Sequence, residues 1–105
     1  MAAMNLNTEQ FYKMMEEGKT ILLDFWAPWC VYCRRISAAY DKLAEQYGDK
    51  LVIAKINVDE EPELAMAHRV ESIPTLVLYD KGEIKKISLG YKSAEDIEGW
   101  LDINN

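Results

Sequence analysis

Cysteine, histidine and proline are scarce in this chain of 105 residues, which has two cysteines, one histidine and three prolines. Two cysteines are too few for the disulfide framework of a small secreted domain. A structural zinc site needs four ligands, and Cys30, Cys33 and the distant His68 could complete one only between two chains. We therefore expect no metal ion, and the pair of cysteines needs another explanation.

Basic residues are in the minority. The chain has 12 lysines and arginines against 18 aspartates and glutamates, and its net charge is −6. Because proteins that bind nucleic acid rely on basic patches, this balance argues against a nucleic-acid partner.

Long apolar runs are missing as well. No stretch approaches the roughly 18–20 apolar residues that span a bilayer. The segment from Met1 to Asn5 has no basic part followed by an apolar run, as a signal peptide would have. We therefore expect a cytoplasmic protein with no membrane partner.

Apolar residues are nevertheless plentiful, at 50% of the chain, which is enough to fill one core. The length fits a single domain over residues 1–105. Charged residues make up 29% and are spread along the chain, which argues against disorder.

The apolar pattern predicts alternating strands and helices. Nearly continuous apolar runs at 20–26 and 51–58 are typical of strands buried on both faces, and a helical pattern at 31–47 lies between them. Such a strand–helix–strand unit has parallel strands. The other expected elements are an edge strand within 1–6, a helix that starts with a capping box at Asn7, a short helix ending near Arg69, strands at 76–79 and 84–89 joined by a hairpin turn, and a last helix carrying Ile97, Trp100, Leu101 and Ile103. This order predicts an α/β fold with a mixed central β-sheet flanked by helices on both faces.

Cys30 and Cys33 lie where the first buried strand gives way to the long helix. Their spacing keeps the two sulfurs within disulfide reach, roughly 4–7 Å between Cα atoms. The unpaired N–H groups and positive dipole of a helix start favour a thiolate, as does the charge of Arg34 and Arg35, and the thiolate is the species that attacks disulfides. The alternative, two buried structural cysteines, is disfavoured by the flanking residues.

Two charged residues interrupt the buried strands. Asp24 lies in the first and Lys55 in the second. Asp24 either faces solvent or is buried, where its charge would be costly. Lys55 either lies near Asp24 or extends its ammonium to the surface.

Several motifs, in order along residues 7–103, resemble the thioredoxin family. They are Asp24-Phe25-Trp26-Ala27-Pro28-Trp29-Cys30-x-x-Cys33, Lys55-x-Asn57-x-Asp59, Ile73-Pro74-Thr75, Lys81-Gly82 and Gly90. The resemblance implies a thioredoxin fold and a thiol–disulfide oxidoreductase that reduces protein disulfides, with Cys30 attacking and Cys33 resolving. It implies that Asp24 exchanges a proton with Cys33 and that Lys55 tunes Asp24.

The same resemblance implies how substrates and partners are engaged. The peptide bond before Pro74 is expected to be cis, and the backbone of Ile73 to pair with an extended substrate segment. The residues predicted to bind substrate are Trp29, Val31, Tyr32, Ile73, Pro74 and Gly90. No cofactor is needed beyond the Cys30–Cys33 disulfide, and the implied partners of the monomer are a flavin thioredoxin reductase as electron donor and disulfide-containing target proteins.

The chain departs from the family in two places. Val31-Tyr32 replaces the usual Gly-Pro between the cysteines, and Ala38 replaces a frequent proline. These changes leave the direction of electron flow open, so a disulfide oxidase or isomerase is one alternative and a non-catalytic thioredoxin-like binding module another.

Four other side chains have simpler interpretations. We expect Trp26 mainly to pack, His68 to lie on the surface and Trp100 to anchor the last helix in the core. Tyr32 either faces a partner or is merely solvated.

Overall fold

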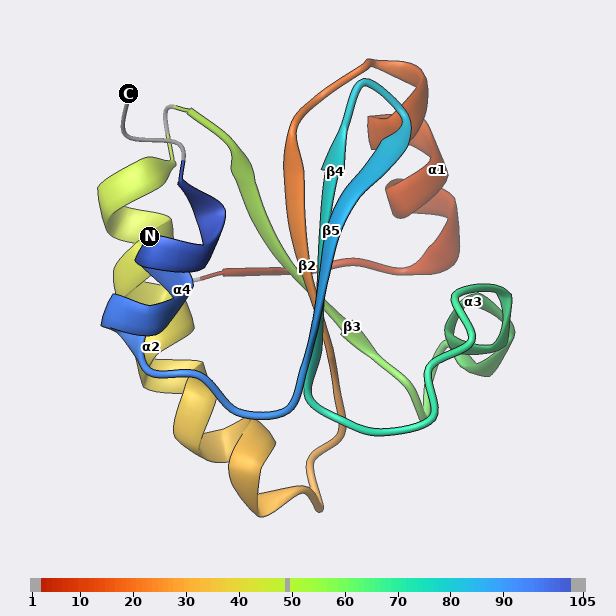
Figure 1. Ribbon diagram of the computed structural model, residues 1–105. Helices are drawn as coiled ribbons and strands as arrows, with labels where there is room; N and C mark the ends of the chain where they lie inside the picture. The colour runs from red at the N-terminus through yellow and green to blue at the C-terminus, as the bar shows by residue number, and fades with distance from the viewer. Residues whose placement is uncertain (1–2, 49, 103–105) are drawn as a thin grey trace.

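Strands and helices alternate along the chain as the apolar pattern predicts (Figure 1). The computed structural model describes residues 3–48 and 50–102. In chain order the elements are β1 (Met4–Asn5), α1 (Thr8–Glu16), β2 (Ile21–Trp26), α2 (Val31–Tyr47), β3 (Val52–Asn57), α3 (Pro62–Ala67), β4 (Thr75–Asp80), β5 (Glu83–Leu89) and α4 (Ala94–Leu101). Ile103, expected on the last helix, lies outside the described residues.

The five strands form one mixed sheet in the order β1-β3-β2-β4-β5. β1, β3 and β2 run parallel, which confirms the parallel unit predicted from the sequence. β4 pairs antiparallel with β2, and β5 pairs antiparallel with β4. The central strand β2 has no exposed surface from Ile21 to Phe25. Its apolar run, interrupted only by Asp24, therefore reflects cover on both faces.

Helices α2 and α4 cover one face of the sheet and α1 and α3 the other, as predicted (Figure 1). Successive side chains of a strand point to opposite faces. Leu22 accordingly packs in the cluster under α2 and α4, whereas Leu23 packs in the cluster under α1 and α3. This alternation decides which side chains of β2 and β3 face the start of α2.

Helix α1 begins at the predicted capping box. The side chain of Asn7 accepts the Gln10 N–H at 2.8 Å, and the Gln10 side chain accepts the Asn7 N–H at 2.9 Å. Two donors at the helix start are thereby satisfied.

Trp100 is not the core anchor that we expected on α4. It is half-buried and packs against the edge of a core cluster, whereas Ile97 and Leu101 are almost wholly buried. Residues four apart share one helix face, so this pair faces the sheet and Trp100 lies at its margin.

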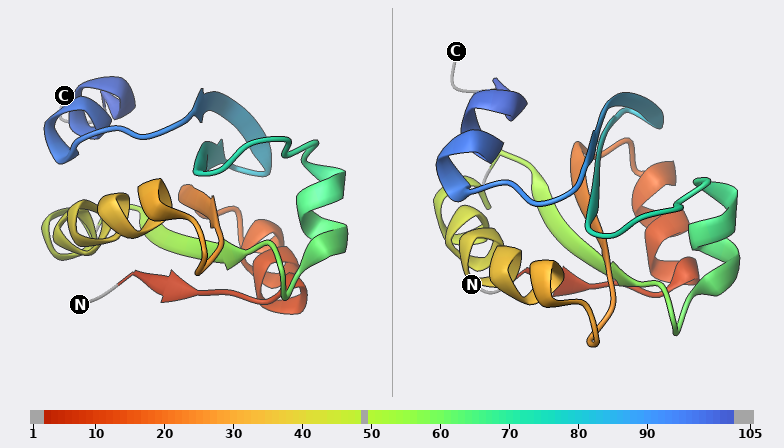
Figure 2. Two further views of the ribbon diagram at one scale, coloured as in Figure 1. Left: turned by 90° about the horizontal axis from the view of Figure 1, so that it is seen from below. Right: turned by 60° about the horizontal axis from the view of Figure 1, so that its bottom comes forward.

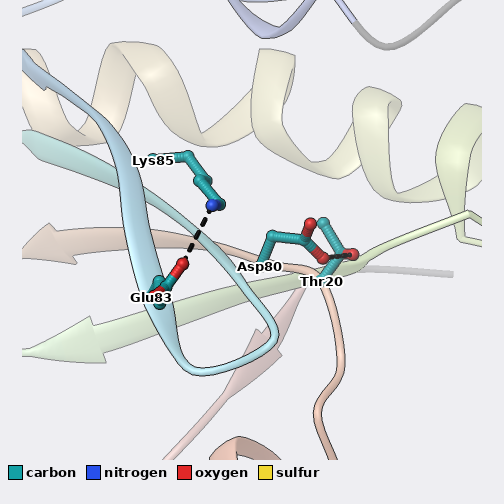
Figure 3. Close-up of polar contacts among 4 residues, drawn as sticks. All are labelled: Thr20, Asp80, Glu83 and Lys85. Atoms are coloured by element: carbon teal, nitrogen blue, oxygen red, sulfur yellow. Dashed lines mark hydrogen bonds and ion pairs between the residues drawn. The ribbon is translucent and has the colours of Figure 1, made fainter.

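The β4–β5 hairpin lies at the end of the sheet where β2 begins. Its turn residues Lys81 and Gly82 have φ values of 52° and 83°, as in the tight two-residue turn predicted from the sequence. Beside it, Thr20 donates to Asp80 at 2.8 Å and Lys85 pairs with Glu83 at 3.0 Å (Figure 3). The Lys85–Glu83 pair is exposed, so it contributes at most about 1 kcal/mol.

Candidate active site

Three connections meet at the carboxyl end of β2. They are the 27–30 link to α2, the 68–74 link to β4 and the 90–93 link to α4 (Figure 2). The thiol of Cys30 lies 3.7 Å from the carbonyl oxygen of Ile73, and the Gly90 N–H donates to the Pro74 carbonyl at 2.9 Å. Residues far apart in the sequence are thus gathered around the cysteines.

Cys30 is the N-cap of α2. It has an extended backbone, and its sulfur accepts the Cys33 N–H at 3.2 Å. A donor aimed at this sulfur and the positive end of the helix dipole both favour a negative charge there. Cys30 is 8% exposed against 2% for Cys33, and both thiols are free. Cys30 is therefore the more accessible sulfur.

Cys33 lies one turn into α2, behind Cys30. Burial raises the pKa of its thiol to about 12, and the hydrogen bond with the Cys30 side chain and the charge of Asp24 act in the same direction. A hydrogen bond with the backbone of Ala27 opposes them. Cys33 therefore stays protonated near neutral pH, and it needs a proton acceptor before it can attack a disulfide.

Asp24 is buried rather than solvent-facing. It has no exposed surface, and neither carboxylate oxygen has a hydrogen-bond partner among the described residues. Burial raises its pKa to about 7, although the positive charge of Lys55 lowers it. A carboxyl group with this pKa exchanges protons readily near neutral pH.

Lys55 lies directly beside Asp24 across the parallel β2–β3 ladder. Its ammonium is 4.4 Å from the centre of the Trp26 ring, a cation–π contact, and 3.5 Å from the Ser37 hydroxyl. Of the two interpretations left open by the sequence, the structure supports the one that places Lys55 near Asp24. Besides packing, Trp26 therefore also binds the Lys55 ammonium through its ring face.

Three predicted substrate-binding side chains project from the start of α2 and the link before it. Trp29 is 66% exposed, Val31 51% and Tyr32 56%. The Trp29 ring N–H donates to Asp59 at 2.9 Å, which fixes the indole beside the cysteines. Tyr32 lies under the Arg35 guanidinium, 5.6 Å from its ring centre, and is otherwise available to a partner.

Ile73 and Pro74 face the cysteines from the other side. The Ile73–Pro74 peptide bond is cis, as the resemblance implied. Pro74 is buried and Ile73 half-buried, and Ile73 turns its carbonyl toward Cys30. Gly90 has a φ of 85°, which favours glycine and lets its N–H reach Pro74. The structure therefore brings together all the residues predicted for the site.

His68 is not the surface residue that we expected. Its ring is half-buried against Phe11 and Phe25, with Nδ1 2.9 Å from the Leu64 carbonyl oxygen and Nε2 2.5 Å from the Tyr79 hydroxyl. Burial lowers its pKa, although the backbone contact acts the other way. The short α3 gave no periodicity long enough to reveal which face is covered.

Two residues that contact side chains of the site were not predicted from the sequence. Asp59 belongs to one of the family motifs but is not among the predicted site residues, and Ser37 belongs to neither set. A signal for Ser37 did exist, because it follows Cys33 by four residues and must therefore share its helix face.

Among residues 3–48 and 50–102, no group of three or more histidine, cysteine, aspartate or glutamate side chains could hold a metal ion. Within the same ranges, none of the helices has the length and apolar character required to cross a bilayer.

Comparison with known proteins agrees with this geometry. The thioredoxin family model matches residues 2–103. A thioredoxin of Alicyclobacillus acidocaldarius is 39% identical over 100 residues, which are 95% of each chain. A thioredoxin of Bacillus subtilis is 41% identical over 98 residues, 93% of each chain, and thioredoxin 1 of Synechococcus elongatus is 39% identical over 90 residues, 86% of this chain and 84% of the other. With a match over nearly its whole length and a cysteine pair at the start of α2 facing a cis-proline, this chain belongs to the thioredoxin family.

Proposed function

We propose that this chain reduces protein disulfides by dithiol–disulfide exchange, with Cys30 as the attacking thiol and Cys33 as the resolving thiol. Membership of the thioredoxin family makes it a thiol–disulfide oxidoreductase. The observation that carries the order of attack is the position of Cys30, the more exposed sulfur, at the helix N-cap and opposite the Ile73 carbonyl.

The reaction proceeds in two exchanges. The Cys30 thiolate attacks one sulfur of the target disulfide, so that a Cys30–target bond forms and the other target sulfur leaves as a thiolate. Cys33 then loses its proton and attacks Cys30, which forms the Cys30–Cys33 disulfide and releases the second target thiolate. The cysteine pair loses two electrons and the target disulfide gains them.

Asp24 takes the Cys33 proton in the second exchange. Its carboxyl group has a pKa of about 7 and is buried under the site, whereas the pKa of Cys33 is about 12. Because its pKa lies near the operating pH, the carboxylate acts as a general base for Cys33, directly or through a water molecule, and Lys55 lowers its proton affinity against the larger effect of burial.

The target binds across the exposed apolar surface around Cys30. Trp29, Val31 and Tyr32 form one side of this surface, and Ile73 and Gly90 the other. An extended target segment pairs its backbone with that of Ile73, in the manner of an added strand.

A separate flavoprotein, a thioredoxin reductase, restores the dithiol, and disulfide-containing proteins are the targets. The cytosol is the proposed location, because a small chain whose two cysteines both serve the redox pair suits a reducing compartment.

The order of attack is tested with single serine variants. In Cys33→Ser the attacking thiol remains but the resolving thiol is missing, so incubation with a protein that has an accessible disulfide, such as insulin, should accumulate a mixed disulfide visible by mass spectrometry. The matched variant Cys30→Ser should form no adduct and reduce no insulin. An adduct with Cys30→Ser and none with Cys33→Ser would reverse the assignment.

A further inference from the structure

We propose that Ser37 is a positioning residue, whose hydroxyl holds the Lys55 ammonium over Trp26 and so leaves the Asp24 carboxyl group unpaired for proton exchange with Cys33. This inference rests on the role proposed above for Asp24, and it adds a residue that the family motifs quoted above do not include.

The first support is the placement of the four side chains. Asp24 and Lys55 are register partners on adjacent parallel strands, and Asp24 and Trp26 alternate onto the same face of β2. Ser37 reaches this group from α2, one helical turn after Cys33. A charged pair side by side on a buried sheet face would ordinarily form an ion pair.

The second support is that no hydrogen bond joins the two charges. Both Asp24 oxygens are buried without a hydrogen-bond partner among the described residues. The Lys55 ammonium instead contacts the Ser37 hydroxyl at 3.5 Å and the Trp26 ring at 4.4 Å from its centre. These two contacts hold the cation near the carboxyl group without a direct bond.

The position of this cation determines how Asp24 titrates. An opposite charge within about 4–6 Å lowers the pKa of a carboxyl group by 1–3 units when it pairs directly. Here burial outweighs Lys55, and the pKa of Asp24 stays near 7. If the Ser37 hydroxyl is removed, the ammonium loses one of its two anchors, and the unpaired oxygens of Asp24 are the acceptors next to it on the ladder.

The other groups that face Asp24 carry no positive charge that could lower its pKa as Lys55 does. Cys33 and Tyr40 interact with its charge from α2, and both hold their protons because burial raises their pKa values. From β4 the register partner of Asp24 is the apolar Leu76. Lys55 is therefore the cation whose position lowers the proton affinity of Asp24 against the effect of burial.

The test is a titration of the Asp24 carboxyl carbon by NMR in the reduced protein, without substrate. Ser37→Ala should lower the Asp24 pKa by about 0.5–1 unit, because Lys55 moves toward the carboxylate. Alanine suits a helix interior, so this variant should fold. Ser37→Thr keeps the hydroxyl and should titrate like the parent protein.

A second set of variants, made in a protein that lacks the Lys55 ammonium, tests whether Ser37 affects the Asp24 pKa through Lys55. Lys55→Met should raise the Asp24 pKa above that of the parent, and Ser37→Ala should then produce no further shift. An unchanged or raised pKa in Ser37→Ala, or an equal shift in the presence and absence of Lys55, would overturn the proposal.

The pH profile of the resolving exchange separates this inference from the proposed function. In Ser37→Ala, the inflection of the rate of mixed-disulfide resolution should move to lower pH by the same amount as the carboxyl titration. If the titration moves and this profile does not, Ser37 still positions Lys55, and it is the role of Asp24 in turnover that fails.

Discussion

Three buried polar atoms on side chains of β2 have no hydrogen-bond partner among the described residues. They are the two Asp24 oxygens and the ring nitrogen of Trp26. Each unsatisfied buried polar group destabilises a fold by about 1–3 kcal/mol, and more when charged. Such atoms therefore mark a position where stability is reduced in favour of chemistry, and the reduction depends on pH.

Asp24→Asn should stabilise the reduced protein at alkaline pH relative to acid pH. The folded carboxyl group has a pKa of about 7 against 3.8 without burial. Folded Asp24 thus keeps a proton that the unfolded chain loses as pH rises between about 4 and 7. Its contribution to stability is fully present below about pH 4 and is lost by about pH 8. A shift of about 3 units corresponds to roughly 4 kcal/mol.

The measurement is urea unfolding of both proteins at pH 4 and pH 8. The free energy of unfolding of Asp24→Asn minus that of the parent should rise between these pH values, by up to about 4 kcal/mol. His68 contributes in the opposite sense, because its pKa is lowered and its stabilisation is lost as pH falls below 6.5. Both proteins share His68, so its contribution cancels. A difference that does not vary with pH would mean that Asp24 is ionised in the folded state.

The residues of the site differ in how easily their roles can be predicted from the sequence. The cysteines and Asp24 stand out because their types contrast with their neighbours, a spaced thiol pair and an acid inside an apolar strand. The sequence did not reveal that His68 is half-buried or that Ser37 meets Lys55, because a single polar residue at a helix looks the same whether it faces water, a tyrosine hydroxyl or a lysine. Only the packing of α3 and α2 onto the sheet distinguishes these cases.

Helix α2 is tied to the sheet by Tyr40 as well as by apolar packing. The Tyr40 hydroxyl lies 2.8 Å from the Leu22 carbonyl oxygen and 2.9 Å from that of Ala54, so one buried side chain reaches both β2 and β3. This contact fixes the helix that carries both cysteines relative to the strand that carries Asp24.

Tyr40→Phe should lower the free energy of unfolding by about 1–2 kcal/mol, because it removes a buried hydrogen-bond donor while keeping the ring. The matched control is Tyr91→Phe, since Tyr91 is 47% exposed, and its effect should stay within about 0.5 kcal/mol. Chemical denaturation of the reduced proteins measures both. Equal effects of the two variants would show that the Tyr40 hydroxyl does not anchor α2.

Elements were easier to predict than the contacts between them. The apolar runs of β2 and β3, each interrupted by one charged residue, and the capping box of α1 are local signals, and the structure contains these elements. The last helix was placed correctly, but Trp100 was not, because the buried face of α4 carries Ile97 and Leu101. Which apolar residue takes the central position depends on the sheet beneath it.

The reduction potential belongs to the whole molecule, because it compares the folded dithiol with the folded disulfide. Val31 and Tyr32, which replace the usual Gly-Pro, are half-exposed and lie outside the buried surroundings of Cys33. We therefore expect a potential near the value of about −270 mV typical of thioredoxin rather than the value of about −180 mV typical of protein disulfide isomerase.

Equilibration in defined thiol–disulfide buffers, followed by alkylation, measures this potential. The gap of about 90 mV between the two expectations corresponds to roughly 4 kcal/mol for two electrons. The double variant Val31→Gly/Tyr32→Pro is the matched control and should lie within about 30 mV of the parent. A parent value near −180 mV would assign the chain to disulfide formation or isomerisation.

The sulfur of Cys30 performs two tasks, since it is the reacting atom and also the group that caps α2 through the Cys33 N–H. A thiolate accepts this hydrogen bond more strongly than a disulfide sulfur does. We therefore expect the first turn of the helix to be held more tightly in the reduced protein than in the disulfide form. The hydrogen-exchange rate of the Cys33 backbone amide should therefore report the oxidation state of the cysteine pair. We expect slower exchange with deuterated solvent in the reduced protein than in the disulfide form.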